Sequence, residues 1–147
     1  MQRIKITPYL SDEGFLIRKQ VFLDEQNFQE EFDALDAQAD HGVIYINDQP
    51  LAAGRGFTKP DDESVYVVSR LAVLKNWRGQ GLGGRMLAVF EERARSLNIN
   101  TMELSAQVRA LKFYTAKGYY PISPSYMDEH CPHIMLRKDL ETHNATD

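Results

Sequence analysis

Hydrophobic and polar residues follow one another along this chain in patterns that predict alternating strands and helices. Residues 3–7 alternate between the two classes and predict a first strand, which Pro8 ends. Ser11 then precedes Asp12 and Glu13, an arrangement typical of a capped helix start. The buried side of that helix is expected to consist of Phe15, Leu16, Ile17, Val21 and Phe22.

The middle of the chain predicts further strands. Residues 42–46 and 51–57 are apolar runs on either side of the turn-forming residues 47–50, so they predict an antiparallel hairpin. Residues 65–73 are rich in β-branched and aromatic side chains and predict a buried strand. Before the hairpin lies an acidic stretch. We expect it to form a solvated loop or a short second helix, with most of its charged side chains in solvent. Those charges are Glu30, Glu31, Asp33, Asp36 and Asp40.

The second half predicts two helices and three more strands. A helix over residues 82–97 is indicated by apolar residues at helical spacing, namely Leu82, Met86, Phe90, Ala94 and Leu97. Glu91 and Arg95 are expected on its exposed side as an i,i+4 ion pair. Residues 101–105 predict a strand, and a second helix over about 107–117 is expected to stop at Gly118. Residues 119–122 and 133–136 can pair to close the sheet.

This order of elements predicts an α+β protein with a mixed sheet and helices packed on it. With 147 residues, 43% of them hydrophobic and 26% charged, the chain is long enough for one domain with a real core. We expect that domain to cover residues 1–140, and residues 141–147 to form a polar tail.

Charge and composition exclude several classes of protein. A formal net charge of −4 and a pI of about 5.6 argue against a dedicated nucleic-acid binder and are compatible with a cationic acceptor. Cys131 is the sole cysteine, so it forms no internal disulfide, and no His, Asp or Glu spacing suggests a metal site. No apolar run approaches the ~18 residues of a membrane span, so a cytoplasmic protein is expected.

The chemistry concentrates in residues 78–84, where the buried strand gives way to the long helix. The order there is Arg-Gly-Gln-Gly-Leu-Gly-Gly. A helix N-terminus presents unpaired N–H groups and the positive end of the helix dipole, and glycine lets the backbone approach an anion closely. Arg78 adds a forked donor suited to phosphate oxygens. The stretch therefore predicts a pyrophosphate-binding loop.

Three other interpretations of these glycines are open. The outer spacing of Gly79 and Gly84 is that of a P-loop, but Arg85-Met86 stands where Lys-Ser/Thr must be. The pattern G-x-G-x-x-G also suggests a dinucleotide-binding turn. However, four residues separate the strand from the motif, and too few residues follow the motif for a dinucleotide-binding fold. A glycine-rich turn that binds nothing is the remaining alternative. The pattern Arg/Gln-x-x-Gly-x-Gly/Ala fits best, through Arg78, Gly81 and Gly83.

That last pattern, with three other pieces, resembles the GNAT superfamily of N-acetyltransferases, and looks most like its ElaA-like branch. The resemblance runs from about residue 4 to residue 138. The four pieces are residues 17–22 with Glu25-Gln26, residues 71–73 with the loop 78–84, residues 105–107 with 113–114 and 118–119, and residues 132–134. It implies the GNAT acyl-CoA N-acyltransferase fold, a central mixed, mostly antiparallel sheet flanked by helices.

The resemblance implies an acetyl-CoA-dependent N-acetyltransferase, with acetyl-CoA as co-substrate and no metal. Backbone groups of the central strand would then pair with the pantetheine arm, which is an amide chain. The loop would hold the pyrophosphate, and a backbone N–H near Ala72 or Val73 would serve the thioester oxyanion. The residues assigned to acetyl-CoA are Leu71, Ala72, Val73, Arg78, Gly79, Gln80, Gly81, Leu82, Gly83, Gly84 and Gln107.

Three catalytic residues are proposed on the same resemblance. Tyr114 matches the tyrosine that protonates the departing CoA thiolate in such enzymes, and its alternative is a packing role. Many relatives carry a glutamate base on the central strand, but residues 68–70 are Val-Ser-Arg and offer no carboxylate. Glu25 and His133 are the best substitutes, with deprotonation through water equally open. A surface role for Glu25 and a structural role for His133 are their alternatives.

A second class of function stays open. The same fold could bind acetyl-CoA without turnover, as a sensor or an assembly module. The missing strand carboxylate favours this interpretation, whereas Tyr114 favours catalysis. The sequence does not identify the acceptor amine, and a homodimer is open because related folds often pair through exposed sheet edges.

Overall fold

The computed structural model describes residues 1–29 and 31–141. Glu30 and six residues of the expected polar tail, 142–147, lie outside the described part. The chain divides into two compact units, one of residues 1–57 and 68–90, the other of residues 58–67 and 91–147. Three elements contribute residues to both units, namely β3 (Gln49–Lys59), β4 (Asp62–Val73) and α2 (Leu82–Ser96).

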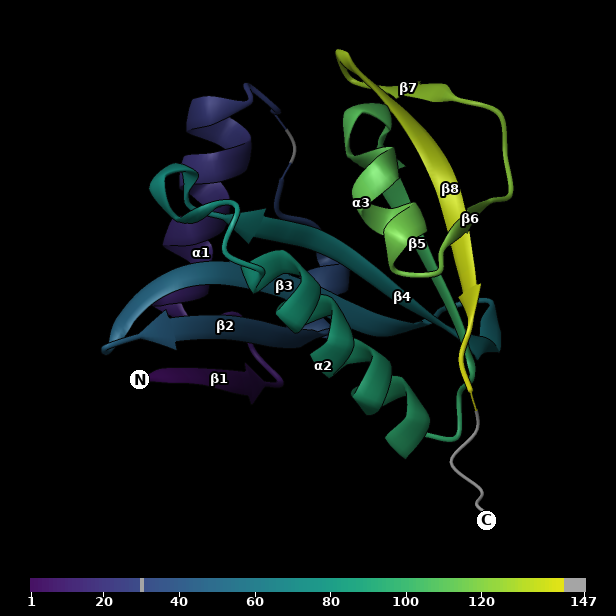
Figure 1. The fold of residues 1–147 in the computed structure, drawn as a ribbon, viewed down its shortest axis with the longest axis horizontal. Coiled ribbons are helices and arrows are strands. Elements are labelled where there is room, and N and C mark those ends of the chain that lie inside the picture. Colours follow the sequence, from purple (N-terminus) through teal and green to yellow (C-terminus); the bar gives the residue numbers. More distant parts are fainter. Residues whose placement is uncertain (30, 142–147) are drawn as a thin grey trace. The chain divides into compact units, whose positions relative to one another are not determined.

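The first unit is built on antiparallel strands (Figure 1). Strand β2 pairs with β1 on one side and with β3 on the other, and β3 is followed in the sheet by β4. The predicted hairpin is confirmed, and its turn places Asn47 and Asp48 at φ 51° and 68°, as a type I′ turn requires. The strands are β1 (Gln2–Thr7), β2 (Asp40–Ile46), β3 (Gln49–Lys59) and β4 (Asp62–Val73).

Two helices cover opposite faces of these strands. Successive residues of a strand lie on opposite faces of the sheet. The paired Gly42 and Gly54 therefore share one face, and the residues next to them in the chain lie on the other. A side chain at Gly54 would lie 2.9 Å from Met86 and Phe90 of α2 (Leu82–Ser96), so the two glycines let this helix approach closely. The opposite face packs on the first helix through a core of Ile17, Val21, Val43, Tyr45, Ala53 and Ala72.

The first helix begins as predicted. The hydroxyl of Ser11 accepts from the N–H of Gly14 at 3.1 Å, and α1 (Asp12–Arg18) follows. The predicted buried side is confirmed for Ile17 and Val21 but wrong for Phe15 and Leu16, which are 41% and 60% exposed. The helix continues as a π-helical segment, η1 (Lys19–Glu25), whose wider winding changes the face that each later residue presents.

The acidic stretch contains one short element. Asp33 caps the 3₁₀ turn η2 (Ala34–Ala37), and the side chain of Asp36 bonds back to the N–H of Asp33, which completes a capping box. The expected short helix is therefore confirmed. The expectation of solvated charges is wrong for Glu31, which is buried, and for Asp36, whose side chain is 13% exposed.

The second unit pairs the rest of the sheet around β8 (Cys131–Asp139). Strand β5 (Thr101–Gln107) runs antiparallel to β8 along its whole length, and the short strands β6 (Tyr120–Pro121) and β7 (Tyr126–Asp128) also pair with β8. The predicted closing pair is thus confirmed. A parallel ladder joins residues 65–67 of β4 to residues 101–103 of β5.

Both later helices end as their sequences predict. Asn98, at φ 61°, follows α2, and Gly118, at φ 95°, follows α3 (Leu111–Ala116). After α3 the N–H groups of Tyr119 and Gly118 donate to the carbonyls of Tyr114 and Thr115, which is a Schellman ending. The predicted helix over 107–117 is observed as a 3₁₀ turn, η4 (Val108–Ala110), followed by α3.

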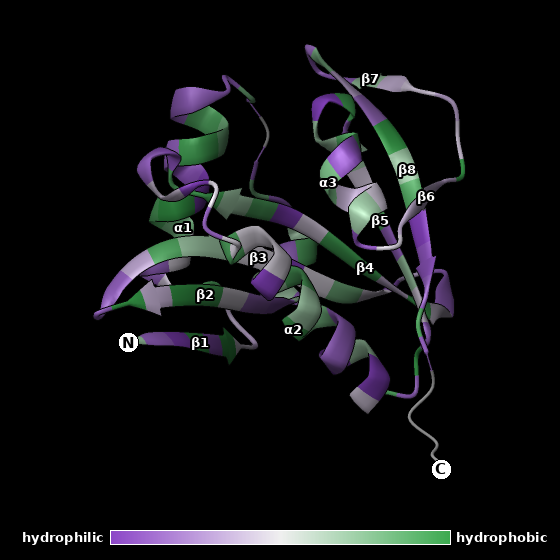
Figure 2. Ribbon diagram, viewed as in Figure 1, coloured by the Kyte–Doolittle hydropathy of each residue, from purple (hydrophilic) through white to green (hydrophobic). Residues whose placement is uncertain are grey.

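The amphipathic pattern of α2 is confirmed, with one correction. Figure 2 shows hydrophobic and hydrophilic residues alternating along this helix. Four of the five predicted core residues are at most 2% exposed, whereas Leu97 is 40% exposed. The expected Glu91–Arg95 pair is wrong. Glu91 is buried and accepts from the Tyr119 hydroxyl at 2.9 Å and from Lys138 at 3.2 Å. Arg95 pairs with Glu92 instead.

The predicted fold class is confirmed. The sheet is mixed and mostly antiparallel, because β4 and β5 form the parallel pair among the registers described. The sheet is combined with the helices α1, α2 and α3. A short 3₁₀ turn, η3 (Lys75–Trp77), links β4 to the glycine loop. Within the described residues, no helix is both long and apolar enough to cross a membrane.

Candidate functional site

The glycine loop has the backbone geometry that an anion-binding turn needs. Gly79 and Gly81 adopt φ angles of 80° and 82°, a region that side-chain-bearing residues rarely enter. A Cβ built on either glycine would meet nothing within 4 Å, so the space beside the backbone is open. Helix α2 begins directly afterwards, and its first hydrogen bond runs from the N–H of Arg85 to the carbonyl of Gly81 at 3.0 Å.

The start of α2 supplies the donors. The N–H groups of the first helical turn have no acceptor within a helix, and those of Leu82, Gly83 and Gly84 occupy that turn. The Leu82 side chain is 2% exposed, so it anchors the turn while the preceding residues 78–81 stay exposed. These features suit a pyrophosphate group. The glycine backbone leaves room for it, the N–H groups of the first turn can donate to it, and the positive end of the dipole of a 15-residue helix attracts its charge.

Arg78 is already engaged in the structure, and its partner is a predicted catalytic residue. Its guanidinium donates to both carboxylate oxygens of Glu25, at 2.6 and 2.8 Å, and its Nε donates to the carbonyl of Val73 at 2.8 Å. The hydrogen bonds that Arg78 donates to Glu25 are the main reason why the pKa of Arg78 is raised. The structure thus brings Glu25 to the loop, but as the partner of its arginine.

The last residues of β4 approach the same loop. Leu71, Ala72 and Val73 end the strand, and the Val73 carbonyl receives the Arg78 hydrogen bond described above. The residue before them, Arg70, has φ 57°, which is the left-handed region. Among the described residues it is the one residue other than glycine that adopts a positive φ inside a strand.

Tyr114 belongs to the second unit, on α3. It is half-buried, and its ring makes edge-on contacts with the rings of Phe113 and Tyr119, at centroid distances of 4.9 and 6.0 Å. Burial raises the pKa of Tyr114 to about 12. The phenol therefore stays protonated at neutral pH, which a proton donor requires.

His133 and Gln107 also lie in the second unit, opposite each other in the β5–β8 ladder. The His133 ring is buried, stacks on Tyr126, and has Nδ1 2.9 Å from the carbonyl of Cys131. A carbonyl only accepts, so Nδ1 carries a proton in this contact. The side-chain amide oxygen Oε1 of Gln107 accepts from Nε of Arg109 at 2.6 Å.

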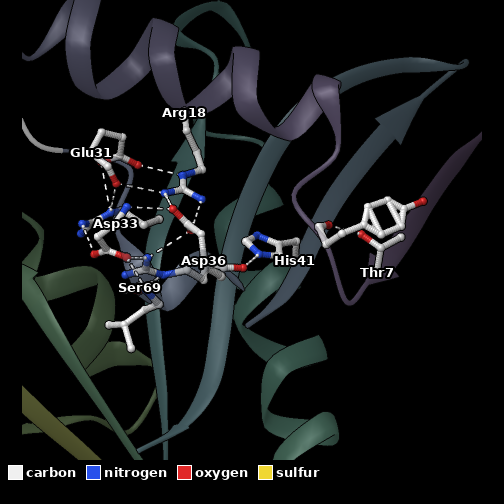
Figure 3. Close-up of polar contacts among 11 residues, drawn as sticks. Thr7, Arg18, Glu31, Asp33, Asp36, His41 and Ser69 are labelled. Atoms are coloured by element: carbon white, nitrogen blue, oxygen red, sulfur yellow. Dashed lines mark hydrogen bonds and ion pairs between the residues drawn. The ribbon is translucent and has the colours of Figure 1, made fainter. Parts of the chain in front are cut away.

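Sequence reasoning missed a group of charged residues in the first unit, which we call the arginine–carboxylate cluster and of which Arg18, Arg55 and Glu31 are buried. Its residues are Arg18, Arg55, Arg70, Glu31, Asp33 and Asp36. Figure 3 shows Arg18 of α1 pointing toward Glu31 and Asp36, with Ser69 of β4 nearby. One signal was available: Arg55 has the same strand parity as the core residues Ala53 and Phe57, and a buried arginine requires carboxylate partners.

Burial and pairing act in opposite directions on the pKa values of this cluster. Burial raises the pKa of Glu31 and lowers that of Arg70, in each case against the attraction of opposite charges. Burial also opposes ionisation of Asp36, but hydrogen bonds from Arg18 and from the Asp33 N–H outweigh it and lower its pKa to about 2. Desolvation by burial likewise lowers the pKa of His41, whose Nε2 lies 2.8 Å from the Asp36 carbonyl.

The fold is that of an acyl-CoA N-acyltransferase, and the comparison with known families agrees. The family described as acetyltransferase (GNAT) domain matches residues 6–140. The chain therefore belongs to the GNAT acetyltransferase family. No group of three or more His, Cys, Asp or Glu side chains within the described residues is placed to hold a metal ion.

Three relatives illustrate the match. The chain is 33% identical over 130 residues to the uncharacterized N-acetyltransferase YjcF of Bacillus subtilis (strain 168), covering 86% of this chain and 91% of that protein. The crystal structure of Escherichia coli ElaA superposes with a TM-score of 0.81 at 25% identity, covering 95% of this chain and 100% of that one. A GNAT family acetyltransferase from Elizabethkingia anophelis, solved with acetyl-CoA bound, shares the fold with a TM-score of 0.75 at 13% identity, covering 95% and 98% of the two chains.

Proposed function

We propose that this protein transfers the acetyl group of acetyl-CoA to an amine by direct attack of the amine on the thioester. The observation that carries the proposal is the loop of residues 78–84. Its two positive-φ glycines leave open space beside the backbone at the start of a long helix. A diphosphate is the group in acetyl-CoA that such a loop would bind, through backbone N–H groups and the helix dipole.

The reaction requires two proton movements. The amine nitrogen forms a bond to the carbonyl carbon, the C–S bond breaks, and the acceptor nitrogen loses one proton while the thiolate gains one. We assign the thiolate proton to Tyr114. Its raised pKa keeps the phenol protonated, and the same desolvation that raises it would also make a nearby thiolate a stronger base.

We assign the general base to His133 rather than to Glu25. The Glu25 carboxylate is bound on both oxygens by Arg78, so removing a proton with it would disturb that ion pair. With a proton on Nδ1, Nε2 is the ring nitrogen that would accept the proton of the amine, and a carboxylate oxygen of Asp128 lies 4.0 Å from it. Deprotonation through a water molecule is the alternative that the test below distinguishes.

The central experiment combines binding with turnover. Acetyl-CoA at a hundredfold excess over its dissociation constant should stabilise the fold by roughly 2.7 kcal/mol, whereas NADH and ATP should do much less. Release of free thiol over a panel of polyamines, amino acids, aminoglycosides and peptides then identifies the acceptor class. An unchanged melting temperature with acetyl-CoA contradicts the proposal. A clear shift without turnover on any amine would favour the non-catalytic sensor instead.

Replacing His133 separates the two routes of deprotonation. His133→Gln keeps a hydrogen-bonding side chain of similar size and removes the base, so the maximal rate should fall by ~10²–10⁴ with little change in acetyl-CoA affinity. A maximal rate in His133→Gln equal to that of the wild type would instead favour deprotonation of the amine through a water molecule. A cytoplasmic location and a homodimer stay predictions.

A further inference from the structure

Arg70 occupies a backbone conformation that needs support. A non-glycine residue with positive φ is uncommon, and inside a strand it persists only where its surroundings hold it. Arg70 has φ 57° within β4 and directly precedes Leu71, Ala72 and Val73. The direction in which those three residues present their N–H and C=O groups therefore depends on the conformation of Arg70.

Side chains of the first unit hold the chain at this point and directly before it. The Nε of Arg70 donates to the backbone carbonyl of Glu31 at 2.9 Å and lies 3.2 Å from its carboxylate, and Nη2 lies 3.3 Å from Asp33. The hydroxyl of Ser69 accepts from the buried Arg55 at 3.0 Å. Two consecutive residues of β4 are thus tied to the arginine–carboxylate cluster.

Glu31 is the residue on which these contacts converge. Its side chain is 3% exposed, and Arg18 donates to its carboxylate at 2.8 Å and to its carbonyl at 3.0 Å. The carbonyl of Glu31 thus accepts from both Arg18 and Arg70, while its carboxylate oxygen Oε2 faces Arg18 and Oε1 faces Arg70.

The charges of the cluster argue against a ligand site. Three arginines face three carboxylates, so their formal charges cancel. The buried members also already satisfy one another. Buried ion pairs contribute little net stability compared with apolar packing, but they can impose one particular conformation.

We propose that Glu31 is a positioning residue, which holds Arg70 in its left-handed conformation and thereby orients the backbone of residues 71–73 for acetyl-CoA. The inference rests on the proposed function, because those backbone groups are the ones assigned to the pantetheine arm and the oxyanion. Glu31 itself contacts no reacting atom; it acts through the Arg70 guanidinium and the strand that carries it.

Two substitutions at Arg70 separate backbone conformation from side-chain contact. Arg70→Ala and Arg70→Gly both remove the guanidinium, but only glycine adopts a positive φ freely. We expect Arg70→Gly to retain about tenfold more turnover than Arg70→Ala at saturating acetyl-CoA. Equal rates for the two variants would overturn the proposal, because the conformation at this residue would then not matter.

Glu31→Gln tests the residue that holds Arg70. We expect turnover to fall at least tenfold in the wild-type background and to be unchanged when it is added to Arg70→Gly, since no guanidinium remains to be held. The matched control is Glu103→Gln, because Glu103 is equally buried, at 3%, and pairs with Lys59 and Arg137 in the second unit. An equal loss of rate in Glu103→Gln, or independent losses from Glu31→Gln and Arg70→Gly, would contradict the positioning role.

A readout that needs no substrate distinguishes failure of this inference from failure of the proposed function. Hydrogen exchange at the amides of residues 71–73 should accelerate in Glu31→Gln and not in Glu103→Gln, under conditions where both are folded. If the wild-type protein neither binds nor turns over acetyl-CoA, the proposed function fails while the exchange result still decides the positioning. Unchanged exchange at these amides overturns the inference, whatever the activity.

Discussion

Gly81→Ala is the sharpest test of the glycine loop, because the structure separates its effect on folding from its effect on binding. The added methyl group would meet no atom within 4 Å, so it introduces no clash. The remaining penalty is that of an alanine at φ 82°, about 1–2 kcal/mol. For a chain of this length that corresponds to a loss of roughly 2–8 °C in melting temperature.

The same methyl group should weaken acetyl-CoA binding much more strongly. It would occupy the open space beside the N–H groups that we assign to the diphosphate. Each lost hydrogen bond to a charged group is worth about 1.5–3 kcal/mol, so the dissociation constant should rise by ~10- to 150-fold. Isothermal calorimetry with acetyl-CoA, at a temperature well below the transition, measures this on the folded variant.

Gly118→Ala is the matched control. Gly118 has φ 95° after α3, and an added Cβ would lie 3.3 Å from the flexible end of Lys138, so its conformational penalty is similar. We expect a comparable fall in melting temperature with unchanged acetyl-CoA affinity. The assignment of the loop is refuted if folded Gly81→Ala binds acetyl-CoA as tightly as the wild type, or if both variants weaken binding equally.

Three further predictions concern ionisable side chains. Tyr114→Phe should lower turnover by ~10²–10⁴ with acetyl-CoA affinity nearly unchanged, and a wild-type rate in this variant would end the assignment of Tyr114 as the acid. Because the pKa of Tyr114 is about 12, ionisation of this phenol should cause no decline in wild-type activity below about pH 11. The pKa of Asp36 is lowered from 3.8 to about 2, so its ionisation stabilises the fold by about 2 kcal/mol above pH 4, and this contribution disappears between pH 4 and pH 2. Urea unfolding across that range should show a flatter dependence on pH for Asp36→Asn, and an unchanged slope would contradict the assignment. Glu25→Gln should free Arg78 for phosphate and lower the dissociation constant of acetyl-CoA about two- to fivefold, whereas a hundredfold loss of rate at unchanged affinity would make Glu25 the base.

Local patterns predicted the fold well wherever neighbouring residues decide the conformation. The helix caps at Ser11 and Gly118 and the hairpin turn at residues 47–50 each depend on a few adjacent residues, and each was predicted correctly. The placement of the glycine loop between strand and helix was equally local. The predicted buried positions Phe15 and Leu16 were wrong, because the burial of a helix face depends on the elements that pack against it.

Side chains that are distant along the chain account for what was missed. Glu91 was assigned to a neighbour one turn away on its own helix, but it bonds to Tyr119 and Lys138, which lie 28 and 47 positions later. Arg78 was assigned to phosphate, but it also binds Glu25, 53 positions earlier. No local pattern contains such pairs.

The amino-acid sequence alone determined the order of elements, the α+β class, the glycine loop and the family resemblance, because each depends on short-range spacing. The tertiary structure alone decided how the charges are used. Burial makes an unpaired charge very unfavourable, so folding has to bring Arg18, Arg55 and Arg70 to carboxylates from a segment that resembles a solvated loop in sequence. The left-handed conformation of Arg70 likewise depends on contacts with residues 37 and 39 positions away, and only the folded chain supplies them.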